Sequence, residues 1–311
     1  MSPTRLCAAL AIALACLPAD AAPRAFVKST GNDANAAAGC TPALPCRSFQ
    51  AAHGVVDAGG EIVALDTAGY GTLVISKSVS VIGNPGIIAG ISVASGAGVS
   101  IATPGVSVTL RNLNINGVGG ERGVEMLDGD ALTIEDCNIS NFTASFYASG
   151  VFVYPNFETS LRITRSVVEG NTRGLYIGSS TITDVAGSPI TGNTVIGIYI
   201  EQGGGNSSMA ISDSVISGNQ SGIRNWAYAG TSRVSIVRAT VANNAGDAIA
   251  NRSEQTGTVV LTIGGSMVSV NGRGFLNDQA AGTAIFESLG NNMLRQNIET
   301  SFGTITVVPG L

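Results

Sequence analysis

One spacing recurs through most of this 311-residue chain. An aliphatic residue returns at intervals of 22 to 29 residues, about 26 on average. These eight anchor positions are Ile115, Ile139, Val168, Ile190, Ile216, Val241, Val268 and Leu294. A period of this length predicts a solenoid, in which each repeat is one coil that buries its apolar side against the next coil.

Fixed offsets from the anchors carry the same residue types. Five residues earlier stands another aliphatic: Leu110, Ile134, Ile163, Val185, Ile211, Ile236, Ile263 and Leu289. Three residues later, the last six repeats carry asparagine: Asn171, Asn193, Asn219, Asn244, Asn271 and Asn297. Short runs of alternating apolar and polar residues predict strands with one buried face. Asparagine tolerates left-handed backbone angles and its amide bonds turn backbone, so one asparagine per coil, about 4.8 Å apart, predicts a hydrogen-bonded ladder.

This pattern resembles the right-handed parallel β-helix of the pectin-lyase-like superfamily over roughly residues 26–308. The fold we expect is therefore all-β, with a single right-handed parallel β-helix of about ten coils over residues 61–311. The segment that contains "GCTPALPCRSFQ" also resembles the N-terminal cap of secreted bacterial β-helix proteins of unassigned function. That resemblance implies a cysteine loop and an amphipathic capping helix within residues 22–60.

The capping helix is expected to cover the open end of the stack, where strand edges are otherwise unpaired. Ser48 is its predicted N-cap, and the pair Gly59-Gly60 is expected to end it. His53, the only histidine in the chain, is expected on the surface of this helix.

Residues 1–21 read as a secretory signal peptide. Arg5 precedes an apolar run over residues 6–17, followed by a small-residue cleavage site. The run is too short to span a membrane, no other stretch is long and apolar enough, and "ALAC" resembles a lipoprotein signal only weakly. We therefore expect a secreted protein, extracellular or periplasmic, that is neither transmembrane nor lipid-anchored. In such an oxidising compartment Cys40 and Cys46 are expected to form a disulfide.

The strand after the asparagine presents two columns of outward side chains. The first column is Glu125, Phe152, Tyr176, Tyr199, Arg224, Ile249 and Leu276, and the second is Leu127, Tyr154, Gly178, Glu201, Trp226, Asn251 and Asp278. Exposed rings in a row predict a platform for sugar rings, with charged groups for hydroxyls or uronic carboxylates. The predicted binding residues are Phe152, Tyr154, Tyr176, Tyr199, Glu201, Arg224 and Trp226. The alternative is that these rings pack beneath the loops that leave the strand.

Arginines beside carboxylates on the preceding strand form a second candidate site. Adjacent coils are expected to place Asp136 beside Arg165, and likewise to pair Asp213 with Arg238. Polysaccharide lyases of the superfamily use such an arrangement, so the resemblance implies the catalytic candidates Arg162, Arg165, Glu135 and Asp136. The alternative is that these are cross-strand ion pairs. The Asn-Thr-Asp and Gly-His-Gly motifs of the superfamily's hydrolases and the Asp-Pro-His-Asp motif of its epimerases are missing, which argues against activity.

Metal, thiol and partner signals are weak. Asp128 and Asp130 of "DGD" lie in an acidic run and are minor candidates for calcium, with a turn-forming Asp-Gly as the alternative. No other cofactor is expected. Cys137 falls in a column of small residues two before the anchors, which predicts a buried, unreactive thiol. The formal charge of −5 argues against nucleic acid and anionic membranes as partners.

Three functions fit this sequence. The first is a non-catalytic surface or extracellular module that binds a polysaccharide or a cell-surface glycan along its flank. The alternative is a polysaccharide lyase or hydrolase that acts on acidic glycans, and a further alternative is a structural spacer. The sequence leaves the oligomeric state open.

Overall fold

The computed structural model describes residues 22–309, which form three parallel β-sheets wound from one chain. The predicted signal peptide, residues 1–21, lies outside the described residues. Sheet A has twelve strands, in spatial order β1 (Ala22–Val27), β2 (Val56–Ala64), β5 (Val79–Gly83), β8 (Ser107–Arg111), β11 (Ala131–Glu135), β14 (Thr159–Thr164), β17 (Thr181–Ala186), β20 (Asn206–Ser212), β23 (Thr231–Val237), β26 (Thr258–Gly264), β29 (Thr283–Ser288) and β32 (Thr306–Val307).

The other two sheets have ten strands each. Sheet B is β3 (Ala68–Gly69), β6 (Ala89–Val93), β9 (Leu113–Gly117), β12 (Asn138–Ser140), β15 (Val167–Glu169), β18 (Pro189–Thr191), β21 (Val215–Ser217), β24 (Thr240–Ala242), β27 (Met267–Ser269) and β30 (Met293–Arg295). Sheet C is β4 (Leu73–Ile75), β7 (Ala97–Ala102), β10 (Arg122–Asp128), β13 (Ser149–Val153), β16 (Arg173–Ile177), β19 (Ile196–Gln202), β22 (Ser221–Ala227), β25 (Asp247–Ser253), β28 (Arg273–Gln279) and β31 (Glu299–Phe302).

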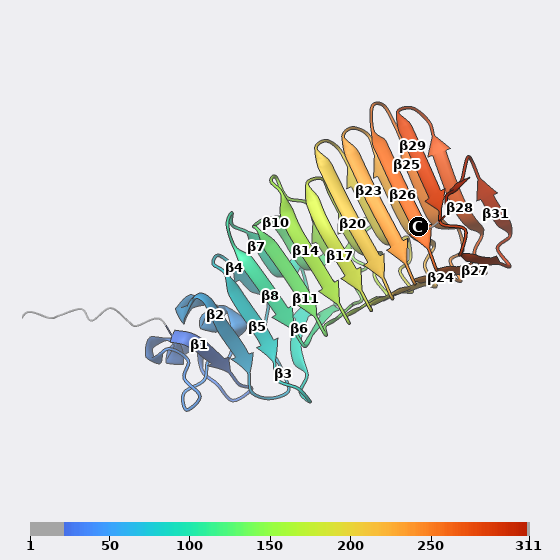
Figure 1. The fold of residues 1–311 in the computed structure, drawn as a ribbon. Helices are drawn as coiled ribbons and strands as arrows, with labels where there is room; N and C mark the ends of the chain where they lie inside the picture. Colours follow the sequence, from blue (N-terminus) through green and yellow to red (C-terminus); the bar gives the residue numbers. More distant parts are fainter. Residues whose placement is uncertain (1–21, 310–311) are drawn as a thin grey trace, which may run out of the picture.

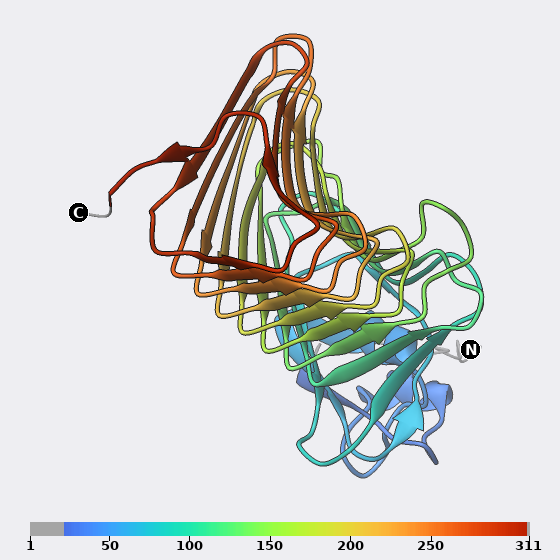
Figure 2. The same ribbon diagram turned by 90° about the vertical axis from the view of Figure 1, so that its right-hand side faces the viewer.

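Each coil contributes one strand to each sheet and then climbs to the next coil, which confirms the predicted β-helix. The strands of sheet A lie side by side along the rod in Figure 1, and Figure 2 shows the coils stacked over one another. Ten stacked strands are separated by nine steps, so the rod has about nine full turns and a length of about 43 Å. This agrees with the expected number of about ten coils.

The predicted anchors form a continuous file inside the rod. Ile115 pairs with Ile139, and the register continues through all eight positions to Leu294. The first seven of these side chains are fully buried. The neighbouring file from Leu110 is also in register, but at its end Ser288, not Leu289, pairs with Ile263. Leu289 lies one residue beyond its predicted place.

The asparagine ladder is present in every one of the six predicted repeats. The side-chain oxygen of Asn219 accepts two hydrogen bonds from Asn193, one from its backbone N–H at 2.9 Å and one from its side-chain amide at 2.8 Å. The amide nitrogen of Asn219 donates to the oxygen of Asn244 at 3.0 Å and to the carbonyl of Ile190 at 3.2 Å. The same bonds link the file from Asn171 to Asn297. Each amide therefore satisfies the backbone of the corner between sheets B and C.

The left-handed backbone conformation at this corner lies at the residue before each ladder asparagine, and not at the asparagine itself as expected. The residue before each ladder asparagine has positive φ: Gly170, Gly192, Gly218, Asn243, Val270 and Gln296. The ladder asparagines are absent from the positive-φ set among the described residues. The bend at the preceding residue turns the chain so that the asparagine side chain points into the rod.

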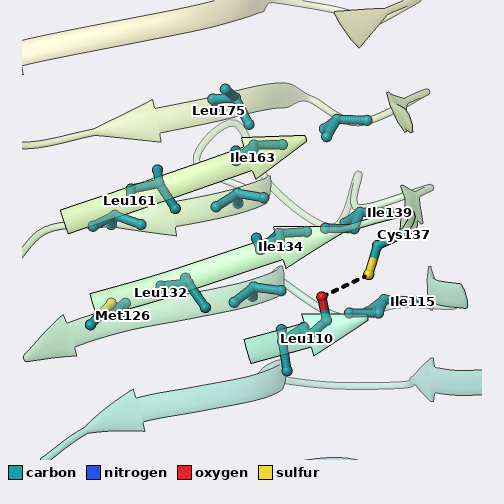
Figure 3. Packing of buried hydrophobic residues seen from close by; sticks show 14 of the residues in the cluster. Leu110, Ile115, Met126, Leu132, Ile134, Cys137, Ile139, Leu161, Ile163 and Leu175 are labelled. Atoms are coloured by element: carbon teal, nitrogen blue, oxygen red, sulfur yellow. Dashed lines mark hydrogen bonds between the residues drawn. The ribbon is translucent and has the colours of Figure 1, made fainter. Parts of the chain in front are cut away.

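A second file of polar side chains runs through the column that contains Cys137. The hydroxyl of Ser188 accepts the backbone N–H of Ser166, and the hydroxyl of Ser166 accepts that of Cys137 at 3.1 Å. The Cys137 thiol lies among aliphatic side chains and points at the carbonyl of Leu110, 3.5 Å away (Figure 3). Burial raises the pKa of the Cys137 thiol to about 12. An inert, buried cysteine is therefore the correct interpretation of this position.

The N-terminal cap contains a disulfide between Cys40 and Cys46, a 3-10 helix η1 (Asp33–Ala38) and the helix α1 (Phe49–Val55). The Ser48 hydroxyl accepts the N–H of Ala51, as an N-cap does. Helix α1 packs on β1, β2 and β4 at the blue end of Figure 1, where it covers the first coil. No helix within residues 22–309 is long and apolar enough to cross a membrane.

Two expectations for this helix are wrong. The helix ends at Val55, because Val56 turns extended and starts β2, which pairs through Gly60 with β5. The pair Gly59-Gly60 therefore lies in a strand. His53 is buried, not on the surface, and its Nε2 accepts the backbone N–H of Ser76 at 3.1 Å. Burial and nearby Lys77 lower its pKa.

Replacing Asn219 by leucine is expected to lower the free energy of unfolding by about 1–3 kcal/mol, because the backbone N–H of Asn193 and the carbonyl of Ile190 lose their partner inside the rod. Thermal and urea unfolding followed by circular dichroism would measure the loss. Asn206→Leu is the matched control, since Asn206 is exposed at the start of β20 and should change stability by less than about 0.5 kcal/mol. Equal melting temperatures for the two variants would contradict the role assigned to the ladder.

Candidate functional site

Aromatic rings from neighbouring coils lie in contact on the outer face of sheet C. The register pairs Phe152 with Tyr176 and Tyr176 with Tyr199, so the rings follow one another along the rod. We call the set Phe152, Tyr154, Tyr176, Tyr199, Trp226 and Tyr228 the aromatic flank. Its ring centroids are 4.8 to 6.2 Å apart, within the range of favourable aromatic pairs.

The flank is only partly open to solvent. Tyr154 is 42% exposed, whereas Tyr176 is 9% exposed and its hydroxyl donates to the Glu201 carboxylate. Phe152, Tyr199 and Trp226 are half-buried. Burial, strengthened by the Glu201 charge, raises the pKa of Tyr176 and Tyr199, so both phenols stay neutral. The predicted platform of exposed rings therefore describes Tyr154, and the alternative of rings packed beneath other groups describes Tyr176.

The predicted columns are one residue out of register in β25, whereas Leu276 and Asp278 of β28 lie in their predicted columns, paired with Ala250 and Arg252. Arg224 pairs with Ala250, not with Ile249, and Trp226 pairs with Arg252, not with Asn251. One additional residue in the corner after Asn244 shifts β25 relative to its neighbours. Asn251 consequently points inward, where it lies between Asn225 and Asn277 in a second file of bonded amides.

The loop over residues 141–148 adds residues that the sequence analysis missed. It carries Phe146 and Tyr147, 59% and 66% exposed, whose rings meet edge to face. The guanidinium carbon of Arg173 lies 4.9 Å from the Tyr147 ring centroid and 5.2 Å from that of Tyr176. The 29-residue interval between Ile139 and Val168, the longest of the seven, was the available sign of a long loop.

Gly174 explains why Arg173 lies on the outer face. A Cβ at Gly174 would lie 2.5 Å from the Gly197 carbonyl oxygen and 2.8 Å from the Ile190 side chain, so this position faces the interior. Leu175, the next residue, is also fully buried. Two consecutive inward positions break the alternation, and Arg173 before them emerges among the rings.

A pocket of about 210 Å³ opens between this loop and the flank. Its lining is aromatic and cationic: Phe146, Arg173, Val195, Ile196, Tyr199, Arg224, Trp226 and Tyr228. Neither Arg173 nor Arg224 forms an ion pair with a described residue. Three of the predicted binding residues, Tyr199, Arg224 and Trp226, therefore line one cavity, and Glu201 lies beside Trp226 on the neighbouring strand.

The four catalytic candidates do not converge on one site. Arg165 donates to both Asp136, at 2.8 Å, and Glu135, while Arg111 donates to Glu135 at 2.7 Å. Hydrogen bonds from these arginines lower the pKa of Glu135, and that from Arg165 lowers the pKa of Asp136. The carboxylate bonds in turn raise the pKa of Arg165. The predicted contacts Asp136–Arg165 and Asp213–Arg238 are both present, and they have the geometry of cross-strand ion pairs.

Arg162 lies apart from these three residues. Its Nε is 3.7 Å from the Asp184 carboxylate, in a groove of about 550 Å³ on the outer face of sheet A. Small and hydroxyl side chains such as Ala210 and Ser235 form the floor of the groove, and Arg233 stands at its other side. Neither Glu135 nor Asp136 reaches it.

The calcium candidates Asp128 and Asp130 also stay separate. The Asp128 carboxylate accepts the backbone N–H of Gly129 at 2.8 Å, and Asp130 is exposed. Among the described residues, no three histidine, cysteine or acidic side chains come close enough together to hold a metal ion.

Comparison with protein families supports the fold. A family model described as "Right handed beta helix region" matches residues 89–262, which is more than half of the chain. The chain belongs to the right-handed β-helix family. Comparison with curated protein sequences finds no significant match.

Solved structures place this β-helix protein in the pectin-lyase-like fold. The crystal structure of pectate lyase Pel9A superposes with a TM-score of 0.64 at 14% identity, covering 92% of this chain and 77% of that one. The A-module of mannuronan C-5 epimerase AlgE6 from Azotobacter vinelandii gives a TM-score of 0.48 at 13% identity, covering 81% and 92%. At 14% identity, the likeness to the pectate lyase shows a shared fold and nothing more.

The Glu135–Asp136–Arg165 cluster gives a pH prediction. Its carboxyl pKa values are lower in the folded chain, so its contribution to stability is complete above the ordinary carboxyl pKa and is lost as pH falls through the lowered values. The double variant Glu135→Gln/Asp136→Asn should differ from the parent by at most about 1 kcal/mol at pH 7. The difference should shrink below about pH 4 in thermal unfolding.

Asp130→Asn is the control, since this exposed carboxylate has no partner among the described residues and its removal should show no such pH dependence. A parent–variant difference that grows on acidification would contradict the assignment of the cluster as ion pairs.

Proposed function

We propose that this protein is a non-catalytic module that binds carbohydrate along the aromatic flank of sheet C. The observation that carries the proposal is the continuous contact of rings from four successive coils, β13 to β22, on one outer face. A ring offers a flat apolar surface on which the C–H face of a sugar packs. Glu201 and Arg224 on the same strands supply an acceptor and a donor for hydroxyl groups.

The setting of the flank supports a polymer rather than an isolated small molecule. Rings on successive strands repeat at the spacing of about 4.8 Å between coils, so contacts extend along the rod. Tyr154 and Tyr147 present exposed ring surface at either side of the buried Tyr176. We propose a polysaccharide or a cell-surface glycan as the partner.

A catalytic role is the weaker proposal. Arg165, Glu135 and Asp136 are occupied by one another and by Arg111, and Arg162 lies in a different groove. A carboxyl group with a lowered pKa is a poor proton donor at neutral pH. One fold can carry many different activities or no activity, so the similarity to a pectate lyase does not decide whether this protein is an enzyme.

We further propose that the protein is exported. The sequence of residues 1–21 and the Cys40–Cys46 disulfide support this, since disulfides persist in oxidising compartments.

A panel of neutral and acidic polysaccharides, scored for both binding and cleavage, tests this function. Tyr199→Ala and Trp226→Ala should each weaken binding of the recognised polymer about tenfold, because each removes stacking worth about 1 kcal/mol or more. Phe302→Ala is the matched control: Phe302 is an exposed ring on sheet C at the far end of the rod, outside the flank, and its loss should leave affinity unchanged.

Each outcome of the panel has a distinct meaning. Binding without release of new chain ends is the expected result. Unsaturated or reducing products from any polymer would favour a lyase or hydrolase, and Arg162→Ala and Arg165→Ala would then locate the activity. Binding that survives both flank substitutions would overturn the proposed surface, and a parent protein that binds nothing would favour the spacer.

A further inference from the structure

Arg173 is a buried arginine without a carboxylate partner. It is 7% exposed, and the only other basic side chain that is buried in the described chain is His53. Its Nε has no hydrogen-bond partner, and no described residue forms a side-chain hydrogen bond or an ion pair with its guanidinium. Burying an unpaired charge is costly, and arginine is almost never fully buried unless it is paired.

Four rings surround the guanidinium without satisfying it. The guanidinium carbon lies 4.9 to 5.5 Å from the ring centroids of Phe146, Tyr147, Tyr176 and Tyr199. Such cation–π contacts offset part of the cost of burial. They leave the buried Nε–H without an acceptor, and the terminal N–H groups form no hydrogen bond with a described residue. The five donors of a guanidinium form a fixed fork that matches an oxyanion.

The same pocket contains a second buried donor without a partner. The indole Nε1–H of Trp226 is buried and donates a hydrogen bond to no described residue. Arg224 lines the pocket too, with its guanidinium carbon 5.6 Å from the Trp226 ring. The lining thus combines two cations and an indole N–H and contains no acidic residue.

The carboxylate of Glu201 is already engaged. Glu201, on the strand beside Trp226, accepts a hydrogen bond from the hydroxyl of Tyr176. Arg252, whose guanidinium carbon lies 5.0 Å from the Trp226 ring centroid, is paired with Glu254 and Asp278. Arg173 and Arg224 are left as the uncompensated charges of the pocket.

We propose that this pocket binds the oxyanion of an acidic sugar residue, a carboxylate or a sulfate ester, held by Arg173 and Arg224. The indole N–H of Trp226 donates to the same group, and the sugar ring lies against Tyr199 and Tyr228. The volume of about 210 Å³ is below the roughly 300–1,000 Å³ of pockets for drug-sized ligands, which suits one charged group with part of one sugar ring. The inference rests on the proposed carbohydrate function and makes one subsite of the flank specific for charge.

Trp226 is the only tryptophan in the chain, so its fluorescence reports directly on the pocket. The probes are sodium glucuronate, glucose 6-sulfate and, as the neutral match, methyl glucoside. The parent protein should show a saturable fluorescence change with one or both anionic sugars, and methyl glucoside should bind at least tenfold more weakly. The tighter of the two anionic probes identifies the carboxylate or the sulfate as the group recognised.

Arg173→Met is the decisive variant, because it keeps the length of the side chain and removes the charge. This variant should bind the anionic probe at least tenfold more weakly than the parent. Its melting temperature should stay equal or rise, since a buried unpaired charge is removed. Arg162→Met is the matched control on sheet A, 62% exposed in its side chain, and should bind as the parent does. If Arg173→Met does not fold, Arg224→Gln at the mouth of the same pocket should weaken the anionic probe several-fold.

The outcomes separate this inference from the proposed function. Equal binding of neutral and anionic probes, or unchanged binding in Arg173→Met and Arg224→Gln, overturns the anion subsite even if polysaccharides bind the flank. Binding of glucuronate or the sulfated sugar that depends on Arg173 supports the subsite even if no polymer is bound, in which case the polymer-binding function is the proposal that fails.

Discussion

The vertical hydrogen bond between coils is the interaction on which the rest of this structure depends. Every strand pairing in the described chain is parallel, and within the coils the paired residues lie about one repeat apart. The Asn171–Asn297 file links the corners in the same direction. Because both backbone and side-chain bonds run along the rod axis, equivalent positions of successive coils are brought directly over one another. Side chains at equivalent positions therefore form columns on the outer face. Tyr199 lies between Tyr176 and Arg224 because the strands that carry them pair in this register.

This regularity explains what the sequence could predict. A period near 26 residues identified the inward anchors, the ladder, the inert Cys137 and the pairing of Asp136 with Arg165. It failed where the number of residues in a corner changes. One extra residue after Asn244 carried Asn251 inside and Arg252 outside, and Ser288 took the place predicted for Leu289. The type of residue 251 did not reveal the insertion, because an asparagine can lie on either face of a strand.

The pocket was beyond sequence reasoning for a different reason. Arg173 reaches the outer face because Gly174 and Leu175 both face inward, a departure from alternation that follows from close packing against Gly197 and not from residue type. Two of the four rings around it, Phe146 and Tyr147, come from a loop whose course depends on tertiary contacts, with Ser145 donating to Glu121 of the preceding coil. The flank could be predicted as a column, whereas its cavity arises from a loop crossing that column.

The pairing of arginine side chains along the rod shows how unusual the pocket around Arg173 is. Eight arginines of the described chain form ion pairs, among them Arg122, whose guanidinium also lies 3.5 Å from the Phe152 ring. Arg233 and Arg295 are exposed to solvent, where a guanidinium needs no protein partner. Arg173 alone combines burial with an unpaired charge. Because no described residue supplies an acceptor to its buried Nε–H, we expect the acceptor to come from outside the chain.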